Sequence, residues 1–111
     1  MARPQPLFRW DGKYWGFVAD SALYDRYGRQ VGWLDGADAY HLNGRFMGEL
    51  REGRHVLREL MRGEPIHRAP REPVPHSAPP TPAPDRQARE LLEGWRDALP
   101  WPLAPPVPPR V

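Results

Sequence analysis

The sequence predicts an all-β domain of repeated 16-residue β-hairpins, followed by a proline-rich extended arm and one short C-terminal amphipathic helix. A repeated pattern in the first half is one basis for this prediction, and composition supplies two more. Eight of the ten glycines lie between residues 12 and 53, whereas fourteen of the sixteen prolines lie between residues 65 and 111. Only the first half therefore has the composition of a packed domain. We divide the chain into a repeat domain (7–63), a proline-rich linker (64–84), a helix (85–99) and a proline-rich tail (100–111).

The pattern x-G-[KR]-x-x-G-x-[VL] occurs three times at intervals of 16 residues, as DGKYWGFV, YGRQVGWL and NGRFMGEL. An apolar strand precedes each copy, and its residues recur at the same period at Phe8, Tyr24, Tyr40 and Val56. Such regular spacing of turn and strand residues indicates hairpins of one kind. The fourth copy has Leu60 in place of the turn glycine. The sequence therefore predicts three hairpins and the first strand of a fourth, with residues 62–67 as its candidate partner.

Each copy carries two glycines with different expected roles. The Asp-Gly and Asn-Gly dipeptides favour two-residue type I′ turns, in which both central residues have positive φ. The second glycine lies inside a strand, where it marks a bend or a close backbone approach near a common axis. The turn glycines are Gly12, Gly28 and Gly44, and the axis glycines are Gly16, Gly32 and Gly48. Closure of the hairpins into a flower or shallow barrel would protect the exposed strand edges.

Strand alternation assigns the aromatic residues to faces. One face of the outgoing strands carries Val18, Leu34 and Leu50. The opposite face carries Trp15, Phe17, Val31, Trp33 and Met47. These five residues are either the core of a small domain or the lining of a ligand pocket near the axis. They are the candidate ligand-binding residues.

These features lead to a family. The stretch from Trp15 to Leu50, followed by VLREL and a tail rich in proline and arginine, resembles the bacterial four-fold beta flower proteins. The three glycine-centred copies and the Leu-Tyr-Asp at residues 23–25 carry the resemblance, which covers residues 7–63. It implies a small all-β domain whose hairpins radiate as four petals around an axis. The shape is similar to a reduced tubby-type domain, and some of those domains bind lipid headgroups.

The second half predicts an extended linker and a docked helix. Proline density from residue 64 to 84 favours polyproline II, with no packed core. Apolar residues then recur at helical spacing, at Ala88, Leu91, Leu92, Trp95 and Leu99. Asp85 is a suitable N-cap, and Pro100 would end the helix. A helix this short is marginal alone, so we expect it to dock on the flower, a second subunit, a partner or a membrane.

Several function classes find no support in the sequence. The chain has no cysteine, and its four histidines lack ligand spacing, so we expect no metal site and no cofactor. No catalytic motif is present, and we expect no catalytic residue and no enzyme activity. Positive and negative charges are spread evenly, with a net charge of +2, which argues against nucleic-acid binding. Neither a secretory signal nor an apolar membrane span is present, so the expected location is cytoplasmic.

The expected function is a non-enzymatic binding module for a protein partner or a small apolar ligand, with the arm docking its helix. Self-association through that helix is a further option. The alternative is a peripheral membrane protein that recognises lipid headgroups through the flower.

Overall fold

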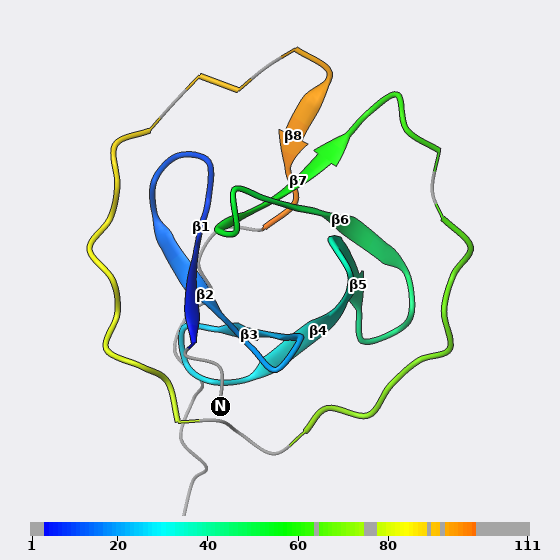
Figure 1. Ribbon diagram of the computed structural model, residues 1–111, viewed down its shortest axis with the longest axis horizontal. Helices are drawn as coiled ribbons and strands as arrows, with labels where there is room; N and C mark the ends of the chain where they lie inside the picture. The colour runs from blue at the N-terminus through cyan, green and yellow to red at the C-terminus, as the bar shows by residue number, and fades with distance from the viewer. Residues whose placement is uncertain (1–3, 64, 75–77, 89, 92, 100–111) are drawn as a thin grey trace, which may run out of the picture.

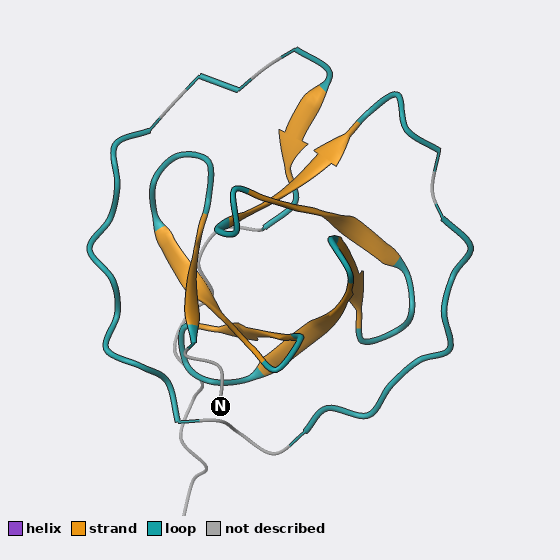
Figure 2. Ribbon diagram, in the orientation of Figure 1, coloured by secondary structure: helices purple, strands orange, loops and turns teal. Residues whose placement is uncertain are grey.

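Eight antiparallel strands form one sheet in chain order in the computed structural model, which describes residues 4–63, 65–74, 78–88, 90–91 and 93–99. The sheet curls around a central axis (Figures 1 and 2), which confirms the all-β prediction. The strands are β1 (Gln5–Phe8), β2 (Tyr14–Ala19), β3 (Ala22–Asp25), β4 (Gln30–Asp35), β5 (Asp38–His41), β6 (Phe46–Arg51), β7 (His55–Glu59) and β8 (Trp95–Asp97). We call the pairs β1–β2, β3–β4, β5–β6 and β7–β8 the first to fourth petals. The tips of the first three petals are residues 9–13, 26–29 and 42–45.

The petal tips are not the predicted type I′ turns. Among the described residues, the tips have positive φ only at their glycines, for example +92° at Gly44. The N–H of Gly44 donates to the carbonyl of His41 at 2.9 Å, as in a type I turn followed by a left-handed glycine. Two successive residues with positive φ occur instead in the short β2–β3 link, at Asp20 and Ser21. Because the tip loop is longer than a two-residue type I′ turn, Tyr27 does not need a positive φ.

Substitution of Gly44 by alanine should destabilise the protein more than the same change at Gly36. Both glycines have positive φ, and an alanine there costs about 1–2 kcal/mol. At Gly44 a Cβ atom would also lie 1.8 Å from the Arg68 carbonyl oxygen, whereas at Gly36 it would meet no atom within 4 Å. We expect Gly44→Ala to cost at least about 1 kcal/mol more than Gly36→Ala in urea denaturation. Equal losses would show that the Arg68 contact contributes no stability.

A β-bulge in each of the first three petals changes the predicted faces. The register jumps past Trp15, Val31 and Met47, so each is an extra residue without a direct partner. The bulge turns these side chains toward the axis, on the same side as Val18, Leu34 and Leu50. Phe17 and Trp33 lie on the other side. The five predicted ligand residues therefore do not share a face, because the alternation rule fails at a bulge.

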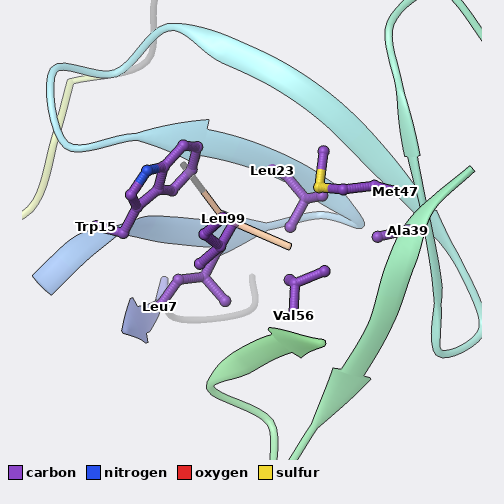
Figure 3. Close-up of a cluster of buried hydrophobic side chains, with 7 residues drawn as sticks. All are labelled: Leu7, Trp15, Leu23, Ala39, Met47, Val56 and Leu99. Carbon is purple, nitrogen blue, oxygen red and sulfur yellow. The ribbon is translucent and has the colours of Figure 1, made fainter. Parts of the chain in front are cut away.

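The core lies along the axis (Figure 3). Leu7, Leu23, Ala39 and Val56 contribute one residue from each petal, and Trp15, Met47 and Leu99 complete the cluster. In the first three petals, the core residue lies directly opposite the second glycine of the repeat. At Gly32 a Cβ atom would lie 2.1 Å from the Tyr40 carbonyl oxygen of the next strand. The strands therefore approach too closely for a side chain at this position.

The fourth petal differs from the others by one inserted residue and by its second strand. The β6–β7 link spans residues 52–54, whereas the two earlier links have two residues each. The insertion places Val56 at the axis, where Leu23 lies in the second petal, and not at the Tyr24 position that the repeat predicts. The second strand is β8, whose residues pair with Leu57–Glu59, so residues 62–67 do not supply it.

The predicted helix at residues 85–99 is wrong, because its described residues are loop or strand. Gly94 has a φ of +85°, which interrupts a helix that would be marginal in isolation. Trp95–Asp97 instead pair with the otherwise open edge of β7 and form β8. Leu99 is buried in the axial core, so the apolar residues of this segment serve the flower and not a helix face. Because the described residues of this segment form no helix, the expected association through an amphipathic helix has no structural support.

We call the segment between β7 and β8 the arm, and its described residues run around the outside of the flower (Figure 1). Its described residues form no helix or strand. The backbone N–H groups of Arg68 and Arg86 donate to the carbonyls of Gly44 and Gly12 at 2.8 and 2.7 Å. Guanidinium groups of the arm also lie over aromatic rings on the outer face: Arg68 over Tyr40, Arg71 over Trp33 and Arg86 over Phe8. Cation–π contacts of this kind hold the arm against the petals.

Candidate functional site

A cavity of about 450 Å³ lies between the tip of the third petal and the strands of the fourth. Its walls combine the end of β5, the third-petal tip and the start of β6 with one residue of β7, the end of β8 and the residue that follows it. The cationic and titratable lining residues are His41, Arg45, Arg58, Arg96 and Asp97. Phe46 and Met47 supply the apolar part of the wall. Three arginines from three separate elements therefore meet at one cavity.

Arg45 lacks the carboxylate partner that its counterparts in the repeat have. In the second petal, Arg29 donates to the buried carboxylate of Asp25 at 2.7 Å. In the first petal, Lys13 lies 3.9 Å from the Asp85 carboxylate. In the third petal, the place of Asp25 is taken by His41, and no carboxylate of the described residues forms an ion pair with Arg45. The guanidinium of Arg45 is exposed and lines the cavity.

Arg58 and Arg96 are direct cross-strand partners in the β7–β8 ladder. Like charges placed opposite each other in an antiparallel pair destabilise it. The guanidinium of Arg58 lies over the Phe46 ring, 4.9 Å from its centroid, which directs this charge along the cavity wall. Within the part of the chain that the structure describes, Arg96 forms no ion pair. Arg96 therefore brings to the cavity a positive charge that a bound anion would offset.

The carboxylate of Asp97 does not neutralise the arginines. Its oxygens accept hydrogen bonds from the backbone N–H groups of Trp10 at 2.7 Å and Leu99 at 3.2 Å. Arg9 of the first petal lies 3.9 Å from the same carboxylate. Burial raises the pKa of Asp97 above its ordinary value, and these hydrogen bonds and the charge of Arg9 oppose the shift. Asp97 thus joins the fourth petal to the first and leaves the cavity cationic.

His41 adds a titratable group to the same wall. Partial desolvation and then the positive charge of Arg45 lower its pKa from the ordinary value of 6.5. At neutral pH the ring is therefore mostly uncharged. A bound anion would raise the pKa of His41, because a negative charge nearby favours the protonated, positively charged ring.

The chemistry of the lining is that of an anion-binding site. Arginine presents planar pairs of N–H donors that fit phosphate and carboxylate oxygens. Among the described residues, no group of three or more histidine, aspartate or glutamate side chains has a geometry that would hold a metal ion. The same part of the chain includes no helix long and apolar enough to span a bilayer.

The candidate ligand residues from the sequence lie elsewhere, with one exception. Trp15, Phe17, Trp33 and Met47 are buried and Val31 is partly buried. Phe17 stacks on Tyr24, and Trp33 stacks on Tyr40, with ring centroids 4.9 and 5.7 Å apart. Met47 alone lines the arginine cavity. The other four are packed against protein.

Sequence reasoning missed Arg45, Arg58 and Arg96. One signal was present, because His41 replaces Asp25 in the repeat and so removes the partner of the following arginine. No signal marked Arg96, since it lies in β8, a strand that the sequence did not predict.

The family comparison agrees with the repeat. A family model described as 4-fold beta flower protein matches residues 5–109, which is nearly the whole chain. The match extends past the third repeat into the residues that complete the fourth petal. Searches of curated proteins and of solved structures return no match.

Proposed function

This chain belongs to the 4-fold beta flower protein family, and we propose that it is a non-enzymatic binding module for ligands that carry a phosphate or carboxylate group. The observation that carries the proposal is the convergence of Arg45, Arg58 and Arg96 on one cavity, where Arg45 and Arg96 have no ion-pair partner among the described residues. A phosphate or carboxylate in the cavity would accept charge-assisted hydrogen bonds from these guanidinium groups.

The test is calorimetric titration of the full chain with sulfate, inorganic phosphate, pyrophosphate and acetate at constant ionic strength. Arg45→Gln should weaken binding of the polyvalent anions by about tenfold or more, because a charge-assisted hydrogen bond contributes about 1.5–3 kcal/mol. The matched control is Lys13→Gln, which removes the same charge at the same repeat position one petal away from any cavity arginine. Equal weakening by both variants, or no binding of any anion, would contradict the proposal.

Anion affinity should also rise as the pH falls. His41 has a lowered pKa in the free protein, and a bound anion would raise it, so binding takes up a proton. Affinity should therefore increase as the pH falls toward the lowered pKa of His41 in the free protein, and should level off below that pKa. Sulfate is the suitable probe because it remains a dianion throughout this range. His41→Gln should remove the increase; an unchanged pH profile in this variant would exclude His41 as its source.

Exposed apolar residues that follow β7 favour a second candidate function, attachment to an anionic membrane surface. Leu60 and Met61 follow β7 directly and are 56% and 88% exposed, and Ile66 is also 88% exposed. We propose that these apolar side chains enter the bilayer interface while the arginine cavity binds a lipid phosphate. Co-sedimentation with vesicles that contain anionic lipid tests this function. It requires that Leu60→Ser/Met61→Ser lose vesicle binding and keep sulfate binding.

A small apolar ligand, the other kind of ligand expected from the sequence, would have a different candidate site. A cavity of about 200 Å³ is lined by Trp10, Leu57, Leu91 and Trp95, together with Arg51 and Glu52. It is smaller than the usual small-molecule pocket. The guanidinium of Arg51 lies 4.5 Å from the Trp95 ring centroid and covers part of the wall. We therefore place the ligand in the arginine cavity.

A further inference from the structure

A cavity of about 560 Å³, which we call the arm cavity, lies where the arm passes outside the tip of the first petal (Figure 1). Its described lining residues come from the first-petal tip, from the point where the β6–β7 link meets β7, and from the arm. Arg54, His55, Arg86 and Gln87 carry its polar side chains, and Trp10 supplies an apolar surface. No aspartate or glutamate is among these lining residues.

The arm wall of this cavity is fixed to the first petal by backbone contacts. The N–H of Arg86 donates to the Gly12 carbonyl at 2.7 Å, and the Asp85 carboxylate accepts the N–H of Tyr14 at 2.9 Å. A Cβ atom on Gly12 would lie 1.8 Å from the Arg86 carbonyl oxygen, so a glycine is required for the arm to approach this closely. The arm therefore presents the Arg86 side chain from a defined position.

Arg86 lacks the carboxylate partner that its counterpart in the arm has. Arg68 docks on Gly44 of the third petal through the same backbone hydrogen bond and the same close approach, and its guanidinium forms an ion pair with Asp35 at 3.0 Å. The guanidinium of Arg86 lies 4.7 Å from the centroid of the Phe8 ring, and no carboxylate of the described residues pairs with it. Contact with a ring face does not use the N–H donors as an ion pair does. These donors are therefore available to a ligand.

Arg54 supplies a second guanidinium from the flower side of the cavity. Its backbone carbonyl accepts the N–H of Phe8 at 2.8 Å, which fixes it at the junction of the first and fourth petals. Its Nε donates a long hydrogen bond of 3.4 Å to the Glu52 carbonyl, and within the described part of the chain it forms no ion pair. The adjacent His55 is 5% exposed, and its Nδ1 lies 3.0 Å from the Phe8 carbonyl oxygen. The Glu52 carboxylate lies 3.9 Å from Nε2 of His55, but Glu52 lines the 200 Å³ cavity and not this one.

We propose that the arm cavity is a second ligand site, which binds a small organic anion between Arg54 and Arg86. An inorganic ion would fill little of its volume, whereas pockets of about 300–1,000 Å³ suit small organic molecules. Trp10 favours a ligand in which an aromatic or other flat group carries the carboxylate or phosphate. The described lining residues of this cavity and of the arginine cavity do not overlap, so this inference does not rest on the proposed function.

The experiment is NMR titration of the full chain with benzoate and with adenosine monophosphate. Each anion is compared with a neutral compound that has the same ring system, benzamide or adenosine. The reporters are the amides of Gly12 and Arg86, and the Leu34 amide in the second petal is the internal control. We expect at least one of the two anions to shift the reporter signals and leave Leu34 unchanged. The neutral compounds should shift none of them at the same concentration.

Substitution of either arginine should weaken this binding. Arg54→Gln and Arg86→Gln should each raise the Kd measured at Gly12 by about tenfold or more, because each removes a charge-assisted hydrogen bond to the anion. The matched control for Arg86→Gln is Arg68→Gln, the same change at the arm residue that docks on Gly44 in the same way. It should leave the Kd at Gly12 unchanged. An unchanged Leu34 signal shows that each variant keeps its fold.

Four results would overturn the inference. Neither anion shifts Gly12 and Arg86, or sulfate at equal ionic strength reproduces the shifts, so that no organic ligand is required. Arg68→Gln and Arg86→Gln weaken binding equally, so that attachment of the arm and not the Arg86 guanidinium is responsible. Arg45→Gln weakens binding at Gly12 as much as Arg54→Gln does, which would assign the ligand to the arginine cavity.

Discussion

Replacement of Leu99 by alanine should destabilise the protein by about 2–5 kcal/mol, which is a large part of the stability of a domain this small. Leu99 is 2% exposed and lies in the axial core with Leu7, Val56 and Trp15. Truncation leaves a cavity among residues that come from different petals, so the surrounding strands cannot collapse into it without a change of register. Urea denaturation measures the change in the free energy of unfolding.

The matched control is Leu60→Ala, the same substitution at a residue that is 56% exposed. It should cost less than about 1 kcal/mol. Deletion of residues 85–111 is the more severe form of the experiment, since it removes β8 together with Leu99. If Leu99→Ala and Leu60→Ala had the same effect, the C-terminal segment would not contribute to the core.

The repeat allowed much of this fold to be predicted because its signals are local. A turn glycine, an apolar strand and a second glycine specify each of the first three petals within a few residues. Neighbouring hairpins in chain order then pair with one another, as consecutive strands usually do. The family resemblance rested on the same residues.

The closing strand could not be predicted because its signals are not local. Trp95–Asp97 has no turn of its own, and it pairs with a strand from which the arm separates it. The spacing of Leu91, Trp95 and Leu99 does fit a helix face, yet Leu99 is required in the core and Trp95 in the ladder. Propensity is a weak determinant when a packed domain offers an open strand edge.

The candidate site also combines a residue that the sequence could have predicted with features that it could not. Arg45 is accessible to sequence reasoning, because the aligned repeats reveal that His41 has replaced the aspartate that binds Arg29. The cationic character of the cavity is not accessible, because charges are balanced along the chain and are brought together only by the pairing of Arg58 with Arg96. Bulges also invalidate face assignments that assume strict alternation, as for Trp15.

The second petal depends on the carboxylate that the third petal lacks. Asp25 is 1% exposed, and its oxygens accept the backbone N–H groups of Tyr27 at 2.8 Å and Arg29 at 3.1 Å. The Arg29 side chain donates a further hydrogen bond at 2.7 Å. In the other tips, the residue at the Tyr27 position performs part of this role, since Asn43 accepts the N–H of Arg45 at 3.0 Å. Asp25 therefore compensates for a tyrosine in the turn.

Asp25→Ala should cost about 2–4 kcal/mol, because it leaves two backbone N–H groups and a partly buried guanidinium without their acceptor. Asn43→Ala is the control, since it removes one hydrogen bond at an exposed tip and should cost about 1 kcal/mol or less. Thermal and urea denaturation of both variants measure the difference. Equal costs would mean that Tyr27 and Arg29 find water or new partners as readily as Arg45 does. A larger cost at Asp25 would show instead that the second petal uses its carboxylate for stability, where the third petal exposes an unpaired arginine to the cavity.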